Sequence, residues 1–313
     1  MPKLIVINGP TAIGKTRFSI ELAKLLKTQI ISSDSRQFYK EMSIGTAVPT
    51  NEERDNIEHY FIQHKSIHEK YSVGDFENEA IDKINSLFKK NNTLILVGGS
   101  NFFTHSVING LDDFPKISDE ITNFWKNSFK NYGIKQLQKE LKKYDFEYYK
   151  KVDLNNHVRL IRALSVCQAG NKKYSQYLGS KNKKRLFETI QIELILPREL
   201  LYKKINDRVD EMIKKGLISE VKSLIKFKNL NPLKSVGYKE IFEYLECKIN
   251  LDESVELIKR NTRRLAKKQI TWLRNHPSDY KVNANTVIDN SFLKIIGIEK
   301  GTKIFLNSFT NII

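Results

Sequence analysis

Apolar runs alternate with amphipathic segments over the first hundred residues of the chain. Three apolar runs, at 4–7, 30–32 and 93–97, have the length of buried strands. A helical pattern at 17–26 follows the first, and short runs of Ser, Asp and Gly follow the other two. Strands that alternate with helices predict an α/β fold whose parallel sheet carries helices on both faces. Ligands in such folds collect at the carboxyl ends of the strands, so we expect the three strand ends to converge on one crevice.

The pattern changes near residue 113. Residues 119–167 are helical in pattern, rich in aromatic residues and Lys, and contain no strand-like run. Residues 188–196 alternate again, as a strand that returns to the sheet does, and a helical pattern follows. We therefore expect an α/β core of residues 1–112 and 186–313, and a helical insertion domain of residues 113–185.

The first predicted strand leads into Gly9-Pro10-Thr11-Ala12-Ile13-Gly14-Lys15-Thr16, which has the spacing G-x-x-x-x-G-K-[ST] of a phosphate-binding loop. Its glycines let the backbone wrap a phosphate, so that N–H groups and a helix N-terminus point at negative charge. Lys15 adds a positive charge, and the Thr16 hydroxyl can bind Mg²⁺. An accidental Gly/Lys turn is the alternative, which the strand–loop–helix context disfavours. We expect a phosphate group at Gly9, Thr11, Ala12, Ile13, Gly14, Lys15 and Thr16, with Asp34 and Ser100 beside them.

Positive charge is the second informative feature. The formal net charge of +17 favours a polyanionic partner, nucleic acid before a membrane surface, although a drift of composition toward Lys is the alternative.

Residues 259–274 contain no acidic side chain, whereas a solvated helix surface usually mixes Glu with Lys. At helical spacing one stripe collects Arg260, Arg263, Arg264, Lys267, Lys268, Thr271 and Arg274, and the opposite face collects Ile258, Leu265, Trp272 and Leu273. This pattern indicates a docked helix that offers its charge to a phosphate backbone; a merely solvated basic face is the alternative.

Cysteine content and hydropathy bear on location. Cys167 and Cys247 have no metal-like spacing and are typical of a reducing compartment. The first predicted strand leaves no room for a signal peptide, and no apolar run approaches the ~20 residues that span a bilayer. We expect a cytoplasmic, monomeric protein without a membrane segment.

Together these pieces resemble the tRNA dimethylallyltransferases, also called tRNA isopentenyltransferases, over most of the chain. The resemblance rests on an ordered series of motifs: the phosphate loop, Ser33-Asp34-Ser35-Arg36-Gln37-Phe38-Tyr39 with Ile44-Gly45-Thr46-Ala47, Tyr71-Ser72-Val73-Gly74-Asp75-Phe76, Asn155 with Arg159-Leu160-Ile161-Arg162-Ala163-Leu164, Arg208 and Met212 with Gly216-Leu217 and Glu220-Val221, Val236-Gly237-Tyr238, and Thr262 to Arg274. The chain departs from the family's usual residues at Ser100-Asn101-Phe102-Phe103, where Ser100 keeps a hydroxyl, and at Val48, Tyr60, Leu154 and Asn156. None of these departures removes a residue that we assign to chemistry.

The resemblance implies transfer of a dimethylallyl group from dimethylallyl diphosphate to N6 of the adenosine 3′-adjacent to the anticodon (position 37) of tRNA. It implies that Lys15, Arg208 and Mg²⁺ on Thr16 stabilise the leaving diphosphate, and that Asp34 accepts hydrogen from N6. The predicted tRNA contacts are Asp34, Ser35, Arg36 and Gln37 at the base, Val158, Arg159, Leu160, Ile161 and Arg162 in the insertion, and the basic stripe with Arg260, Arg263, Arg264, Lys267, Lys268 and Arg274.

Several alternatives stay open at the level of sequence. Arg208 could form a surface salt bridge, and Asp34 could hold a Mg²⁺-bound water, as in an NTPase. The rival functions are a P-loop kinase, an isopentenyltransferase of free adenine nucleotides, and a non-catalytic RNA-binding protein. The strand at 93–97 ends in Gly98-Gly99 with no Asp, which disfavours an ATPase. We interpret His59, His64 and His68 as structural or surface groups.

Overall fold

The computed structural model describes residues 1–179 and 183–298, which form two compact units. One unit comprises residues 1–108 with the described residues from 185 onward, and the other comprises residues 109–184. Within the described residues, none of the helices has both the length and the apolar content needed to cross a membrane.

The larger unit is built on a six-stranded sheet in the order β3-β2-β4-β1-β5-β6, in which every neighbouring pair is parallel. Its strands are β1 (Lys3–Asn8), β2 (Ile30–Ser32), β3 (His59–Tyr60), β4 (Thr93–Val97), β5 (Glu188–Ile195) and β6 (Tyr280–Asn283). The four strands predicted from the sequence are confirmed. The two missed strands, β3 and β6, lie at the edges of the sheet and are only two and four residues long, too short for a pattern of alternation.

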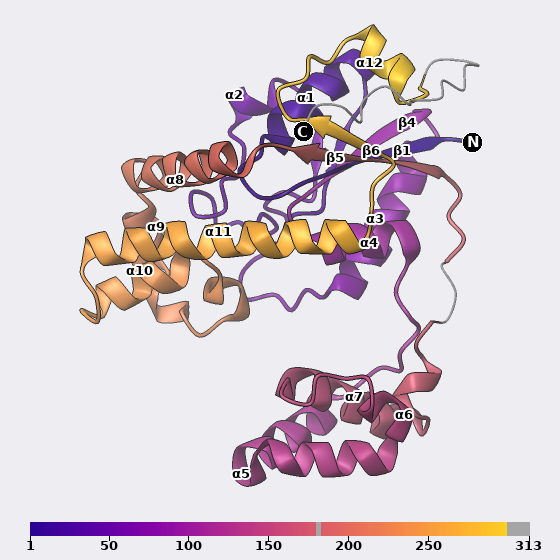
Figure 1. The fold of residues 1–313 in the computed structure, drawn as a ribbon, viewed down its shortest axis with the longest axis vertical. Helices are drawn as coiled ribbons and strands as arrows, with labels where there is room; N and C mark the ends of the chain where they lie inside the picture. Colours follow the sequence, from indigo (N-terminus) through magenta and orange to yellow (C-terminus); the bar gives the residue numbers. More distant parts are fainter. Residues whose placement is uncertain (180–182, 299–313) are drawn as a thin grey trace. The chain divides into compact units, whose positions relative to one another are not determined.

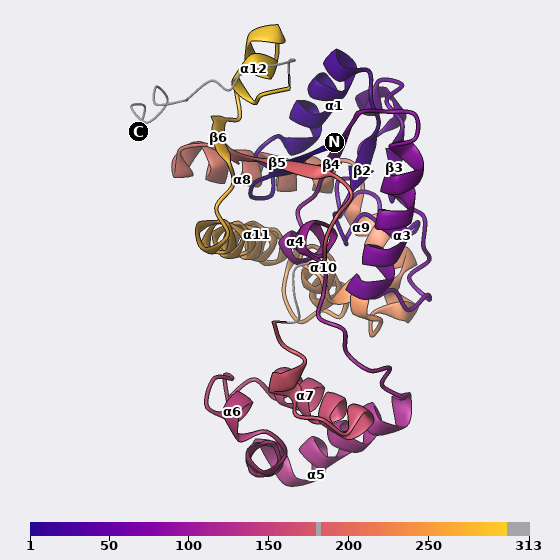
Figure 2. The same cartoon turned by 90° about the vertical axis from the view of Figure 1, so that its right-hand side faces the viewer.

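Helices cover both faces of this sheet, because alternate side chains of each central strand point to opposite sides. Ile5 and Ile7 of β1 pack with Phe18 of α1, whereas Leu4 and Val6 pack with Phe76 of α3. Figures 1 and 2 show α1 and α12 over one face and α3 and α4 over the other. The helices of this unit are α1 (Lys15–Leu26), α2 (Asn51–Arg54), α3 (Val73–Leu87), α4 (Asn101–Asn109), α8 (Arg198–Lys214), α9 (Leu217–Ser223), α10 (Tyr238–Leu245), α11 (Leu251–Asn275) and α12 (Asn290–Ile295), with 3₁₀ turns at Ile225–Phe227 and Asn231–Lys234. The expected α/β fold with a parallel sheet is confirmed.

A separate apolar cluster joins α8 to α11 and the segment that follows β2. Its fully buried members include Met42, Leu217 and Tyr238. The Glu220 carboxylate of α9 accepts hydrogen bonds from the backbone N–H groups of residues 43, 44 and 45 at 2.7–3.0 Å, and from the Tyr238 hydroxyl at 2.6 Å. A Cβ at Gly45 would lie 2.6 Å from the Tyr238 ring, so only glycine allows this close packing. The Ile44-Gly45-Thr46-Ala47 motif is therefore held by α9 and α10.

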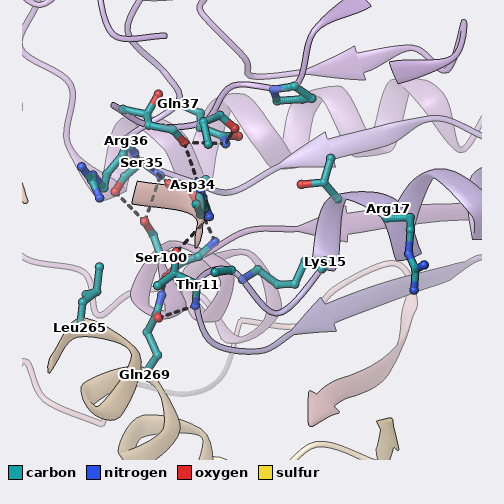
Figure 3. Close-up of a pocket in the computed structure, with 18 of the residues that line it drawn as sticks. Thr11, Lys15, Arg17, Asp34, Ser35, Arg36, Gln37, Ser100, Leu265 and Gln269 are labelled. Carbon is teal, nitrogen blue, oxygen red and sulfur yellow. Dashed lines mark hydrogen bonds between the residues drawn. The ribbon is translucent and has the colours of Figure 1, made fainter. Parts of the chain in front are cut away.

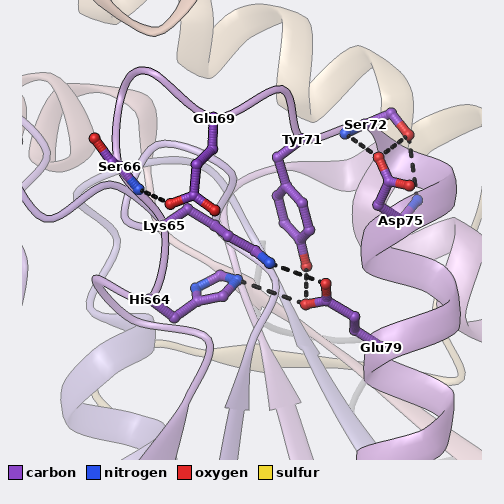
Figure 4. A network of polar contacts seen from close by, with 8 residues as sticks. All are labelled: His64, Lys65, Ser66, Glu69, Tyr71, Ser72, Asp75 and Glu79. Carbon is purple, nitrogen blue, oxygen red and sulfur yellow. Dashed lines mark hydrogen bonds and ion pairs between the residues drawn. The ribbon is translucent and has the colours of Figure 1, made fainter.

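The motif at 71–76 begins α3 and anchors a polar network (Figure 4). The Ser72 side chain accepts a hydrogen bond from the Asp75 N–H and so caps the helix. One turn further on, the Glu79 carboxylate accepts hydrogen bonds from Tyr71 Oη at 2.8 Å and Lys65 Nζ at 2.9 Å. Burial and the adjacent Lys65 charge lower the pKa of His64 to about 4. His64 is therefore neutral near pH 7 and packs within this network.

The smaller unit is helical. It contains α5 (Asp119–Tyr144), α6 (Phe146–Tyr149), α7 (His157–Gly170) and a 3₁₀ turn at Tyr174–Gln176, around a core that includes Trp125 and Leu141. The helical pattern predicted at 119–167 is broken after α5 by buried Asp145, whose carboxylate accepts hydrogen bonds from Tyr148 N and from the Ser175 N and Oγ. An aspartate that caps a new helix ends the previous one, and the sequence pattern did not show this break.

Candidate active site

The phosphate loop lies between β1 and α1, as the sequence predicts. Gly9 and Gly14 have φ angles of 148° and 111°, which favour glycine, and Gly14 caps the N-terminus of α1. The Lys15 ammonium donates hydrogen bonds to the carbonyls of Gly9 and Pro10, both at 2.9 Å. Burial lowers the pKa of Lys15 to about 8, with the Asp34 charge opposing this shift and the Arg208 charge adding to it. The Ile13 side chain is in the core, so this residue offers a ligand only its backbone.

Asp34 follows β2 and lies beside this loop. Its carboxylate accepts hydrogen bonds from the Arg36 N–H at 3.1 Å and from the Gly99 N–H at 3.2 Å (Figure 3). A Cβ at Gly99 would lie 2.8 Å from Asp34 Oδ2, and one at Gly98 would lie 2.3 Å from Ser33 Oγ. The two glycines after β4 therefore allow the loops after β2 and β4 to approach closely. The expected convergence of the strand ends is confirmed.

Ser100 joins the same two loops. Its hydroxyl accepts a hydrogen bond from the Ser35 N–H at 3.0 Å and lies 2.6 Å from the Ser35 hydroxyl. Asn101, one of the departures noted from the sequence, begins α4 and donates from Nδ2 to the Gln269 carbonyl at 3.3 Å. This departure therefore adds a contact between α4 and α11.

Arg208 of α8 reaches the phosphate loop from the other side. Its guanidinium donates to Thr11 Oγ1 at 3.3 Å and to the Thr46 carbonyl at 3.5 Å. Burial lowers the pKa of Arg208, and the nearby Asp34 charge opposes that effect. Arg208 thus faces the loop, and the alternative of a surface salt bridge finds no carboxylate partner among the described residues. Two cationic side chains, Lys15 and Arg208, therefore flank the place where a phosphate is expected.

These groups open onto one cavity of about 990 Å³. Its polar lining includes Thr11, Lys15, Thr16, Asp34, Ser35, Arg36, Gln37, Ser100 and Arg208, and its apolar lining includes Phe102, Phe103, Leu265 and Trp272. The sequence pattern placed Leu265 and Trp272 on the packing face of a helix, but both are only partly buried, and they line the cavity. A site of this composition can hold a ligand that is anionic at one part and apolar at another.

Arg36 and Gln37 also hold the segment at 43–47. The Arg36 guanidinium donates to the carbonyls of Gly45 and Val236, and the Gln37 amide donates to the carbonyls of Thr46 and Ala47 at 3.1 and 2.9 Å. Their donors therefore shape the cavity wall, a role that sequence motifs alone do not reveal.

The basic stripe of α11 is exposed, with one exception. Arg260, Arg264, Lys267, Lys268 and Arg274 are exposed, and Lys268 also lines the cavity. Arg263 is partly buried and donates to Asn206 Oδ1 of α8 at 2.7 Å. The Arg263 side chain therefore links α11 to α8. The exposed positive charge of the stripe belongs to its other Arg and Lys residues.

The predicted contacts on α7 divide by helical face. Val158, Arg159 and Arg162 are exposed, and the Arg162 guanidinium lies 5.3 Å from the centre of the Phe114 ring. Leu160 and Ile161 are instead buried in the core of the smaller unit. Their side chains therefore hold the helix in place, and the tRNA contact predicted for residues 158–162 stays a prediction whose side-chain part rests on Val158, Arg159 and Arg162.

Two residues of the site were missed from the sequence: Gln269 was given no role, and His59 was interpreted as a structural or surface group. Gln269 of α11 forms hydrogen bonds to both the phosphate loop and Gly99. His59 lines a second, small cavity that it shares with Lys15, Thr16 and Asp34. Gln269 belongs to the segment from Thr262 to Arg274 that resembles a family motif, but no spacing rule connects a residue at 269 or 59 to a loop at 9–16.

Comparisons with known proteins agree with this geometry. A family model described as IPP transferase matches residues 37–276. The tRNA dimethylallyltransferase of Christiangramia forsetii is 47% identical over 290 residues, which cover 91% of this chain and 96% of that protein. That of Flavobacterium psychrophilum is 46% identical over 299 residues, with 92% and 97% covered.

Solved structures give the same result. The tRNA isopentenylpyrophosphate transferase of Bacillus halodurans superposes with a TM-score of 0.68 at 33% identity and covers 95% of both chains. A eukaryotic dimethylallyltransferase described as acting on tRNA superposes with a TM-score of 0.80 at 26% identity, covering 95% of this chain and 77% of that one. The family model matches more than half of the chain, and the two tRNA dimethylallyltransferases are more than 40% identical over nearly their whole length, so the chain belongs to the IPP transferase family.

Proposed function

We propose that this protein transfers a dimethylallyl group from dimethylallyl diphosphate to N6 of the adenosine 3′-adjacent to the anticodon of tRNA, and releases diphosphate. The observation that carries the proposal is the shared cavity. A phosphate loop, two cations and a carboxylate open onto the same space as a wall of aromatic and aliphatic side chains. This arrangement suits an anionic leaving group on an apolar allylic chain, next to a proton acceptor.

The leaving group governs the chemistry, because an exocyclic adenine amine is a weak nucleophile. As the bond between the allylic carbon and the diphosphate oxygen breaks, negative charge grows on the diphosphate. Lys15, Arg208 and the N–H groups of the loop stabilise that charge from fixed positions. The guanidinium of Arg208 can bind phosphate oxygens in a bidentate manner.

Asp34 is the proton acceptor in this proposal. The new bond joins N6 to the allylic carbon, and N6 then loses a proton to the Asp34 carboxylate. The N–H groups of Arg36 and Gly99 fix the carboxylate in place. Ser35, Arg36 and Gln37 line the adjacent wall, where the adenine is expected to enter from a single-stranded loop.

The residues around Thr16 fit a Mg²⁺ ion. The described chain offers no group of three or more His, Cys, Asp or Glu side chains for a metal, so protein ligands are few. Mg²⁺ commonly keeps several waters and binds through substrate phosphates, with the Thr16 hydroxyl available here. His59 Nδ1 donates to the Ile57 carbonyl, which leaves Nε2 as an acceptor without a partner among the described residues. Nε2 can therefore accept from a metal-bound water. When bound, the ion supplies positive charge to the leaving diphosphate.

The cationic surfaces are proposed to bind the anticodon stem-loop. The exposed cations of α11 form one surface, and Val158, Arg159 and Arg162 of the insertion form the other. Contacts to phosphates release counterions, so binding of this kind weakens as salt increases. We further expect the protein to act as a monomer in the cytoplasm; the free thiol of exposed Cys247 is consistent with a reducing compartment.

Charge removal on α11 tests the RNA surface. The double variant R264Q/K267Q is expected to bind the stem-loop more weakly, with the slope of log K against log salt concentration reduced by about 1.4–1.8. Fluorescence anisotropy over a salt series measures both quantities. The pair K89Q/K90Q, at two exposed lysines after α3, removes the same charge elsewhere and serves as the control. If affinity and slope match those of the wild type, the stripe is only a solvated face.

The transfer assay tests the function itself. Purified protein, Mg²⁺ and labelled dimethylallyl diphosphate are mixed with an unmodified anticodon stem-loop, and AMP is tested in parallel. We expect label on the stem-loop and none on AMP. Label on AMP alone would assign the protein to free nucleotides, and label on neither, together with tight ATP binding, would favour a kinase. The absence of a carboxylate directly after β4 already disfavours ATP hydrolysis.

A further inference from the structure

Gln269 lies on the buried side of α11, within a stretch of otherwise exposed residues. Its exposed fraction is 6%, whereas Lys267, Lys268 and Ile270 are exposed. A buried polar side chain on a helix that faces an active-site cavity requires partners, since an unsatisfied amide is costly. The partners of Gln269 are backbone groups of two different loops (Figure 3).

The Gln269 amide links the phosphate loop to the loop after β4. Its Oε1 accepts a hydrogen bond from the Thr11 N–H at 2.8 Å, and its Nε2 donates to the Gly99 carbonyl at 2.6 Å. The Gly99 N–H in turn donates to Asp34 Oδ2 at 3.2 Å. A single side chain therefore connects the backbone of the phosphate loop to Gly99, the residue whose N–H orients the proton acceptor.

The spacing leaves little freedom at this junction. A Cβ added at Gly99 would lie 2.8 Å from Asp34 Oδ2 and 3.4 Å from Gln269 Nε2. In addition, Asn101 Nδ2 donates to the backbone carbonyl of Gln269 itself. A shift of the Gln269 side chain would therefore move the phosphate loop and the Gly99 peptide relative to each other.

The two bonds demand a specific side chain. Thr11 offers a donor and Gly99 offers an acceptor, so the group between them must accept and donate at once. A methionine of similar length does neither, and an ionised glutamate only accepts. A protonated glutamate does both, because its carbonyl oxygen accepts while its hydroxyl donates.

We infer that Gln269 is a positioning residue for group transfer. Its side-chain amide, which accepts one hydrogen bond and donates another, sets the distance between the phosphate loop and Asp34. This inference rests on the proposed function. A misplacement of about 1 Å between reacting groups can cost about 10²-fold in rate. Removal of the amide is therefore expected to lower kcat far more than it changes tRNA affinity.

The experiment compares wild type, Q269M and Q269E by rate of transfer to the stem-loop between pH 5 and pH 8.5. Q269M is expected to lower kcat about 10²-fold, with a ratio to wild type that does not change with pH. Q269E is expected to be as slow as Q269M or slower at high pH. As the pH falls, the introduced glutamate gains a proton. The rate of Q269E relative to the wild-type rate is then expected to rise, because the neutral acid restores both hydrogen bonds. The ratio to wild type, compared between Q269E and Q269M, separates the effect of the introduced carboxyl group from the pH dependence that the enzymes share.

Two controls separate this role from general damage. I270E places the same carboxylate on the next, exposed position of α11, and its rate ratio to wild type is expected to stay flat over this pH range. Stem-loop affinity, measured by anisotropy for each variant, reports on folding, and the pH recovery of Q269E is observed within one protein. Rates of both Gln269 variants within twofold of wild type, or a flat ratio for Q269E, would overturn the inference. If the wild-type protein transfers no label to the stem-loop, the proposed function itself is wrong.

Discussion

Replacement of Asp34 by alanine is expected to lower the rate of prenyl transfer by about 10²–10⁴-fold, because this carboxylate accepts the proton that N6 must lose. Its two oxygens are held by the N–H groups of Arg36 and Gly99, so the carboxylate is oriented before substrate arrives. Affinity for the stem-loop is expected to remain close to that of wild type, since the phosphate contacts proposed for α11 and the insertion are untouched. Single-turnover transfer and anisotropy measure the two quantities separately.

The control for Asp34 is Asp82, an exposed aspartate of α3. D82A removes the same charge away from the cavity lining and is expected to transfer at the wild-type rate. A variant D34A that binds tRNA poorly but, once saturated, transfers at the wild-type rate would show that Asp34 reads the base and is not the proton acceptor.

Replacement of Lys15 by methionine is expected to lower kcat/KM by about 10²–10³-fold, as removal of one preorganised donor to a developing charge does.

The same variant is expected to change the pH dependence of diphosphate binding. Burial, opposed by Asp34 and reinforced by Arg208, lowers the pKa of Lys15 to about 8 in the free protein. The ammonium is therefore charged below pH 8 and neutral above it. Because a bound diphosphate favours the charged form, affinity is expected to be greatest below pH 8 and to fall as the pH rises through that value.

Calorimetric titration with inorganic diphosphate between pH 6.5 and pH 9.5 measures this effect. The difference between wild type and K15M isolates the Lys15 contribution, since the titration of diphosphate itself is common to both. K215M alters another lysine that lines the cavity and is expected to retain the pH dependence of the wild type. Parallel curves for wild type and K15M would show that Lys15 does not contact the diphosphate.

The network around Glu220 explains why the site depends on segments far from the phosphate loop. Glu220 and Tyr238 hold the segment at 43–45, whose neighbours Thr46 and Ala47 accept hydrogen bonds from Gln37. Thr46 also accepts from Arg208. Gln37, Thr46, Ala47 and Arg208 line one wall of the cavity, and Glu220 and Tyr238 support that wall from behind through the segment at 43–45.

The sequence alone determined the local parts of this protein. The spacing of Gly9, Gly14, Lys15 and Thr16 predicts the phosphate loop. Three apolar runs and one alternating segment predict four strands, because both kinds of pattern depend on residues that are neighbours along the chain. The parallel order also places Asp34 at a shared edge with the loop, which the structure confirms.

Only the tertiary structure decided which distant residues complete the site. Helical periodicity placed Arg263 with the exposed cations and Trp272 with the packing face, whereas the contacts of α11 tie Arg263 to α8 and turn Trp272 to the cavity. No sequence pattern identifies Gln269 as a site residue, because its role depends on hydrogen bonds to two backbone groups more than 160 residues away along the chain. Periodicity reports which face of a helix is apolar, but the partners of that face depend on the path of the whole chain.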